Sequence, residues 1–405
     1  MNKYSTELTK ELRINGVNKV YRVYTFELNE IYLNDKNDRI FTEMSKEDVS
    51  KLIELREQNI KEYNRKMKDL VKKSNTTSFE RTRNNIEIHG QNEPGVILKD
   101  GRVIDGNRRL SCLLELADKN PHINYRFKAV LLEDLDENDA QTIKSLELNL
   151  QFAKETVQAY NPFDKALGAY KAIVDDKILT FDQYVEESNI SKKEVQEYIT
   201  ISEVLIEILD WINEPNKFYL AIENSWYDPI KECCKALKKF KEMSLPEDEF
   251  NRRKACLFFN TVMSANDKTR YLRDIVKILE NEKVAETFLT KEQEIFDMFL
   301  KEINDFDKVT NDANKFQIHK KNLLNKPEFV TDFRALPHAA SEMLFLYNEK
   351  AKWKSLLNKS LNCLSTVDMD LARVMPAKDK EDFKKMLEEI KEKIEAMNQE
   401  IYGSN

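Results

Sequence analysis

The residues of this chain best suited to chemistry are two adjacent arginines, Arg108 and Arg109, which directly follow Asp105-Gly106-Asn107. Before them, two short apolar runs flank an Asp-Gly turn signal, a pattern that predicts a β-hairpin. After them, leucines recur at helical spacing, so the arginines are expected in the first turn of a helix. Free backbone N–H groups and the helix dipole favour an anion there, and guanidiniums suit phosphate oxygens. The pattern predicts a phosphate site; the alternative is an ordinary strand-to-helix turn with exposed arginines.

The elements that must position these arginines form a mixed α/β front half of the chain. Strands are predicted at Val20–Leu28, Val96–Leu98, Arg102–Ile104 and Phe127–Leu132, and a charged helix at about Lys46–Lys73. From about residue 136 the pattern is helical, in keeping with only 7 glycines and 9 prolines among 405 residues. We expect an α+β fold of three domains: an α/β domain at 1–135, a helix-turn-helix-like domain at 136–212 and an all-helical C-terminal domain at 213–405.

Several short motifs, in the same order along the chain, resemble those of the ParB/sulfiredoxin superfamily, and specifically ParB-like proteins. The resemblance covers roughly Tyr24–Trp211. The first motif is Tyr24–Arg39, which is similar to the family's first strand and the following loop, which ends in an arginine. Next come a Gly-x-x-x-Pro motif at Gly90–Pro94, before the central hairpin, and a Gly-x-Arg-Arg box at Gly106–Arg109. The last is a third box at Asn149–Gln151, followed by Tyr160–Phe163. The resemblance implies a ParB/sulfiredoxin-like nucleotide-binding domain at the front of the chain.

That family uses its nucleotide site as a CTP-hydrolysing switch or, more rarely, for ATP-dependent phosphoryl transfer. The resemblance therefore implies CTP or ATP with Mg²⁺ as ligands. The residues it assigns to nucleotide binding are Asp105, Gly106, Asn107, Arg108, Arg109, Asn149 and Gln151. Glu30 and Glu147 are the candidate catalytic or metal-linked carboxylates. The chain departs from the family where Leu148 replaces the usual Glu before Asn149, and where the arginine box lacks the cysteine that sulfinic-acid repair requires.

A helix-turn-helix is predicted at Phe181–Val204, where two helical patterns flank Asn189-Ile190-Ser191. The second helix, Lys192–Ile201, would be the recognition helix. Lys192, Lys193 and Gln196 are its candidate DNA-contacting residues, and ParB-like proteins place a DNA-binding helix-turn-helix at this point. Glu194 and Glu197 on the same helix would face phosphates unfavourably, so a purely structural helix pair is the alternative.

The formal net charge of −7 is not that of a general nucleic-acid coat protein. One stretch, Lys61–Arg83, is locally basic, with eight basic residues against three acidic ones. It could contact a phosphate backbone or a nucleotide, or it could be a solvated face of the charged helix and the loop expected after it.

An apolar seam marks the C-terminal helix, which follows Pro376. Its members alternate by four and three residues: Phe383, Leu387, Ile390, Ile394, Met397 and Ile401. This helix could pair with a second copy to form a homodimer, or it could lie on the chain's own helical bundle.

Composition excludes several classes. The chain has no run of eighteen apolar residues and a polar N-terminal segment, so we expect neither a membrane span nor a secretory signal. Five cysteines without CxxC spacing and four histidines argue against a zinc site and for a cytoplasmic protein. The leading hypothesis is nucleotide-gated DNA binding. The alternatives are an enzyme, either a phosphotransferase or a nuclease, and an interaction protein that does not hydrolyse nucleotide.

Overall fold

The computed structural model describes residues 2–136, 138–152, 161–264, 268–305 and 315–403. It divides the chain into two compact units, Met1–His338 and Ala339–Asn405. The first unit has a mixed sheet with helices followed by a helical part, so the expected α+β class is confirmed. The three-domain division predicted from the sequence, at 1–135, 136–212 and 213–405, stays a prediction.

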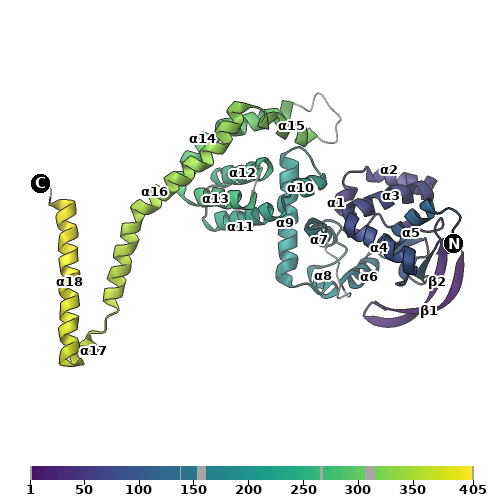
Figure 1. Cartoon of the computed structure of the whole chain (residues 1–405), viewed down its shortest axis with the longest axis horizontal. Helices are drawn as coiled ribbons and strands as arrows, with labels where there is room; N and C mark the ends of the chain where they lie inside the picture. The colour runs from purple at the N-terminus through teal and green to yellow at the C-terminus, as the bar shows by residue number, and fades with distance from the viewer. Residues whose placement is uncertain (1, 137, 153–160, 265–267, 306–314, 404–405) are drawn as a thin grey trace. The chain divides into compact units, whose positions relative to one another are not determined.

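One six-stranded sheet organises the front of the first unit (Figure 1). Its spatial order is β1 (Lys3–Ile14), β2 (Val17–Glu27), β6 (Arg126–Leu132), β4 (Gly95–Leu98), β5 (Arg102–Asp105) and β3 (Tyr32–Leu33). The pairs β4–β6 and β3–β5 are parallel, and the other three neighbouring pairs are antiparallel. The four predicted strands are confirmed as β2, β4, β5 and β6, whereas β1 and β3 were not predicted.

The region expected to be one helix and a loop contains three helices. They are α2 (Val49–Gln58), α3 (Ile60–Ser74) and α4 (Thr76–His89). Asn59 ends α2 and caps α3, because its side chain accepts a hydrogen bond from the N–H of Glu62. Asn75 caps α4 in the same way through the N–H of Ser78. The prediction of a single helix and a following loop was therefore wrong, and two asparagine caps are the physical reason.

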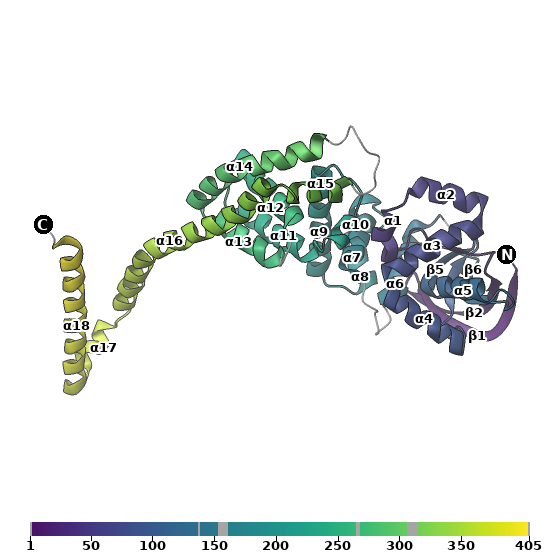
Figure 2. The same ribbon diagram turned by 45° about the horizontal axis from the view of Figure 1, so that its top comes forward.

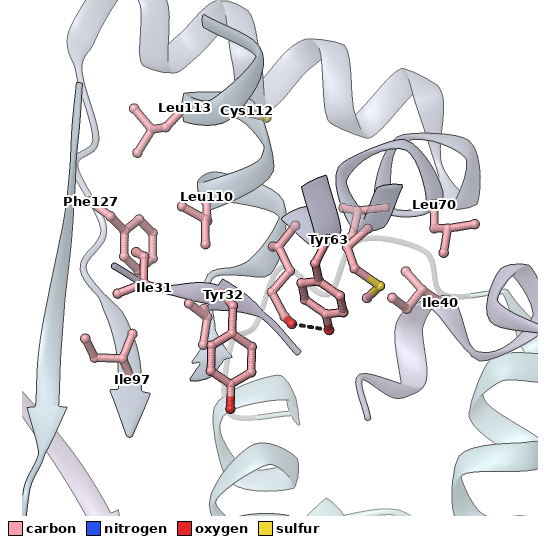
Figure 3. Close-up of a cluster of buried hydrophobic side chains, with 14 of the residues drawn as sticks. Ile31, Tyr32, Ile40, Tyr63, Leu70, Ile97, Leu110, Cys112, Leu113 and Phe127 are labelled. Carbon is pink, nitrogen blue, oxygen red and sulfur yellow. Dashed lines mark hydrogen bonds between the residues drawn. The ribbon is translucent and has the colours of Figure 1, made fainter. Parts of the chain in front are cut away.

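Each face of the sheet has its own apolar core. On one face, α3, α4 and α5 (Asn107–Lys119) cover a core that includes Tyr63, Leu110 and Phe127. Figure 3 shows Leu110 and Leu113 of α5 on the same side as Phe127 of β6. On the other face, Ile143 and Leu146 of α6 (Ala140–Phe152) pack against the sheet. The helical spacing of the α5 leucines thus fixes which way its first turn faces.

The rest of the first unit is helical in the part that the structure describes. The elements after α6 are α7 (Pro162–Tyr170), the π-helical turn η2 (Lys171–Asp175), α8 (Phe181–Ser188), α9 (Lys192–Trp211), α10 (Tyr219–Glu223), α11 (Tyr227–Glu242), α12 (Glu247–Met263), α13 (Lys268–Glu280), α14 (Glu282–Asp305) and α15 (Lys315–Leu324). Figure 2 shows α11, α12 and α13 beside one another. The Trp211 ring stacks on Phe296 and Phe299, with centroids 5.8 and 5.4 Å apart, which ties α9 to α14.

The second unit is formed by the end of α16 (Pro327–Ser365), by α17 (Met369–Val374) and by α18 (Ala377–Tyr402). Among the described residues of this unit, only Ala340 and Ala372 are buried. No helix in the described part of the chain is both long and apolar enough to span a bilayer.

Candidate functional site

A pocket of about 250 Å³ opens at the N-terminus of α5. It brings together seven of the nine residues that the sequence singled out as nucleotide-binding or catalytic: Asp105, Gly106, Asn107, Arg108, Arg109, Glu147 and Gln151. The remaining lining residues come from the short 3₁₀ helix η1 (Asp38–Ile40) and the residue before it, from α3 and α4, from β5 and from α6: Asn37, Arg39, Ile40, Val71, Ser74, Thr82, Ile104 and Leu150. Segments far apart in the sequence therefore converge on the start of α5.

Gly106 sets the direction of the first turn of α5. Its φ is +101°, in the left-handed region that favours glycine. A Cβ atom at this position would lie 2.9 Å from Cζ of Phe127 and 3.0 Å from Nη2 of Arg109. As the N-cap residue, Gly106 has no side chain to accept a hydrogen bond from the first-turn N–H groups. These donors, at the positive end of the helix dipole, are suited to an anion.

Three guanidiniums line the pocket, from Arg39, Arg108 and Arg109, against the two carboxyl groups of Asp105 and Glu147. The Nη2 of Arg109 lies 2.9 Å from Oδ2 of Asp105, and the Nζ of Lys10 on β1 lies 3.4 Å from the same oxygen. Asp105 therefore holds Arg109 in place. The Nε of Arg109 is buried and has no hydrogen-bond acceptor among the described residues.

Asn107 uses both ends of its amide within the fold. Its Oδ1 accepts a hydrogen bond from the N–H of Asn34 at 2.9 Å, and its Nδ2 donates to the carbonyl of Val103 at 3.0 Å. These bonds join the start of α5 to β5 and to the chain that follows β3. Asn107 thus shapes the pocket wall, and its role as a direct ligand stays a prediction.

Glu147 is a buried carboxyl group at the pocket wall. Its Oε1 accepts a hydrogen bond of 2.7 Å from Nδ2 of Asn34, and its Oε2 lies 3.9 Å from Nζ of Lys144. Burial raises the pKa of Glu147 to about 7, although the nearby ammonium of Lys144 opposes this shift. A carboxyl group that titrates near neutral pH can accept or release a proton, or it can bind a metal ion when ionised.

Two predicted residues lie outside the pocket lining. Asn149 faces α8, because its amide donates to Oε2 of Glu187 and to the carbonyl of Ser145. Glu30 follows β2, where its carboxylate accepts hydrogen bonds of 2.7 and 3.0 Å from the backbone N–H and the amide of Asn2. The start of the last motif, Tyr160, falls outside the described residues.

Some lining residues were missed by sequence reasoning. Arg39 was noted only as the end of the first loop. Its charge and its place in the first motif were the signal that could have identified it as a pocket residue. Ser74 and Thr82 carried no signal, because the residues after Lys73 were expected to form a loop. Ile40, Val71, Ile104 and Leu150 add an apolar wall. The pocket lining therefore combines guanidinium, carboxyl, hydroxyl and apolar groups.

Part of the basic stretch Lys61–Arg83 forms ion pairs within the protein, whereas Lys61, Lys66, Lys73 and Arg81 are exposed. Lys68 lies 2.7 Å from Asp118, and Lys72 and Arg83 lie 3.0 and 2.9 Å from Glu115. Although burial raises the pKa of Glu115, hydrogen bonds from Arg83, Lys72 and Lys119 hold this pKa at about 2. The ion pairs join α3 and α4 to α5, so they support the wall of the pocket.

Helices α8 and α9 have the predicted helix–turn–helix order. Asn189 adopts φ +54°, and Ser191 caps α9 by accepting a hydrogen bond from the N–H of Glu194. Among the candidate DNA-contacting residues, Lys193 and Gln196 are exposed, and Lys192 lies 2.7 Å from the exposed Asp182. Glu194 and Glu197, which were expected to face phosphates unfavourably, both have partners within the protein. Glu194 accepts a hydrogen bond from the Tyr198 hydroxyl, and Glu197 forms an ion pair with Lys231. At 20 residues, α9 extends ten residues beyond the expected recognition helix.

No group of three or more His, Cys, Asp or Glu side chains gathers as a metal site in the part of the chain that the structure describes. A Mg²⁺ ion would therefore depend on phosphate oxygens for several of its ligands, as is usual for this ion. Comparison of the sequence with protein-family models and with curated proteins finds no match.

Proposed function

We propose that this protein binds a nucleoside triphosphate, CTP or ATP, with its phosphates at the N-terminus of α5. The observation that carries the proposal is the convergence of Arg39, Arg108 and Arg109 on a helix start that Gly106 leaves without a side-chain cap. Charge-assisted donors and helix N–H groups are the usual means of holding phosphate. A volume of about 250 Å³ is slightly below the about 300–1,000 Å³ of typical small-molecule pockets, so it suits the phosphate-bearing part of the ligand.

Mg²⁺ fits this site as a partner of the phosphates. When bound, it would neutralise phosphate charge and favour attack at phosphorus. Glu147 is the carboxyl group in the lining that could bind the ion, because its Oε2 lies 3.9 Å from the nearby cation of Lys144, whereas Oδ2 of Asp105 lies only 2.9 Å from Arg109. Of the two predicted catalytic carboxylates, Glu147 is also the one at the pocket. It is therefore our candidate for orienting water if the triphosphate is hydrolysed.

Nucleotide-gated DNA binding is the wider role that we propose. Its support is the capped turn between α8 and α9, with Lys193 and Gln196 exposed at the start of α9. Contacts to phosphates from this end of α9 would position the protein on a duplex. Helix α9 packs on α7 and α11, so it is anchored to the rest of the helical part.

Self-association through α18 is part of the same proposal. No described residue of this helix is buried, and Leu387, Ile394, Met397 and Ile401 are 45, 51, 42 and 67% exposed. Isolated helices of this kind gain most of their stability from packing an apolar face. A second copy presents the same seam, which would form a homodimer.

A ligand panel tests the nucleotide proposal. Calorimetric titration of the full chain with ATP, CTP and inorganic triphosphate, with and without Mg²⁺, should show binding, whereas adenosine and cytidine should bind far more weakly. Equal binding of nucleosides and nucleotides would show that the arginines do not hold phosphate. Binding without release of inorganic phosphate would favour a non-hydrolysing interaction protein over a nucleoside triphosphatase.

A further inference from the structure

A buried lysine lies behind the pocket without being part of its lining. Lys144 of α6 has a side chain that is 11% exposed, and its Nζ lies 2.6 Å from Oδ2 of Asp38. The same Nζ is 3.9 Å from Oε2 of Glu147. Although burial alone would lower the pKa of Lys144, the carboxylates of Asp38 and Glu147 raise it. The lysine is therefore a buried cation between two acids that belong to different elements.

Asp38 connects Lys144 to the pocket lining. It stands between Asn37 and Arg39, both of which line the pocket, and the three belong to or adjoin the short helix η1. Oδ2 of Asp38 also lies against α7, where a Cβ on Gly168 would be only 2.7 Å away. The backbone that carries Arg39 is thus fixed by the partners of the neighbouring carboxylate.

A second contact holds the same segment from the other side. Oδ1 of Asp164 on α7 accepts hydrogen bonds from the N–H and the hydroxyl of Thr42, at 2.9 and 2.8 Å. Thr42 belongs to α1 (Phe41–Met44), which directly follows η1. Asp164 therefore anchors the chain after Arg39 through Thr42, and Lys144 anchors the chain before Arg39 through Asp38.

We infer that Lys144 positions Arg39 for the phosphates of the ligand by binding Asp38, and that it does so without touching the ligand. This inference rests on the proposed function. Without Lys144, the buried carboxylates of Asp38 and Glu147 lose the cation between them. The carboxylate of Asp38 would then move out of its buried position, and the backbone of η1, which carries Arg39, would move with it.

The test is a double-mutant cycle with inorganic triphosphate as the probe. The full chain, Lys144→Met, Arg39→Ala and the double variant are titrated by calorimetry, and their thermal unfolding is measured in parallel. Loss of one charged hydrogen-bond partner should weaken binding by about tenfold or more in each single variant. Because Lys144 acts through Arg39, the double variant should bind no more weakly than Arg39→Ala.

Lys326→Met is the control. Nζ of Lys326 lies 2.8 Å from Oε2 of Glu302 in the helical part of the first unit, and neither residue lines the pocket. The loss of this ion pair should leave affinity for triphosphate unchanged. Lys144→Arg, which keeps the charge, should restore much of the binding that Lys144→Met loses.

The outcomes separate the two proposals. Absence of binding by the unaltered chain overturns the proposed function and this inference with it. Binding by the unaltered chain, together with normal affinity in Lys144→Met or with additive losses in the double variant, overturns the inference alone. If Lys144→Met does not fold, Asp38→Asn/Lys144→Met removes both charges of the pair; weak binding by this folded variant supports the inference, and normal binding refutes it.

Discussion

Replacing Gly106 by alanine should damage the pocket at its most constrained backbone position. The φ of +101° costs a residue with a Cβ about 1–2 kcal/mol. The added methyl would meet Cζ of Phe127 at 2.9 Å and Nη2 of Arg109 at 3.0 Å, and overpacking of this kind costs about 1–3 kcal/mol. We expect Gly106→Ala to lower the free energy of unfolding by about 2–5 kcal/mol. It should also weaken triphosphate binding, because Arg109 must move away from Asp105.

Gly16→Ala separates backbone strain from the damage at the site. Gly16 has φ +76° in the β1–β2 turn, but a Cβ there would meet nothing within 4 Å. This variant should lose about 1–2 kcal/mol and bind triphosphate normally. Urea unfolding and calorimetric titration of both variants make the comparison. Equal stability losses, or normal binding by Gly106→Ala, would refute the role given to Gly106.

Three further predictions concern Glu147, α9 and α18. Because Glu147 is ionised above its pKa of about 7, it should repel a triphosphate in Mg²⁺-free buffer at about pH 8. Glu147→Gln should therefore bind triphosphate about tenfold more tightly than the unaltered chain at this pH. The two affinities should converge as the pH falls below about 6, and a difference that stays constant with pH would contradict this prediction. Lys193→Ala should weaken DNA binding and reduce the slope of log affinity against log salt by about 0.9, whereas an unchanged slope excludes this contact. Ile394→Lys should convert a dimer into a monomer by light scattering, while Glu392→Lys, off the apolar seam, should not; a monomeric unaltered chain contradicts the seam's role.

Much of the sheet and the position of the candidate site could be predicted from the sequence. The hairpin β4–β5 and the start of α5 follow from local signals: apolar runs, an Asp-Gly turn and leucines at helical spacing. Asn15-Gly16, which has positive φ at both residues, is also a strong hairpin signal. It could have revealed β1, whose mostly exposed residues lack a clear alternation of apolar and polar side chains.

The rest of the site depends on long-range packing that local patterns do not encode. Nothing in the sequence near Lys144 specifies its pairing with Asp38, which is 106 residues away. Asn149 has the residue type of a ligand, yet the helix directs it toward Glu187 on α8. Ser74 ends α3 and Thr82 lies on α4, a helix that was not predicted because the residues after Lys73 were expected to form a loop.

Phosphate binding by the arginines at the start of α5 underlies the proposed function, and a titration of arginine variants measures it. Calorimetry with Mg²⁺ and either CTP or ATP compares the unaltered chain with Arg108→Ala and with Arg22→Ala, which removes an exposed arginine from β2. Loss of a charged hydrogen bond worth about 1.5–3 kcal/mol should weaken binding about tenfold to a hundredfold in Arg108→Ala only. Equal affinity in all three proteins, or no binding by any, would contradict the account.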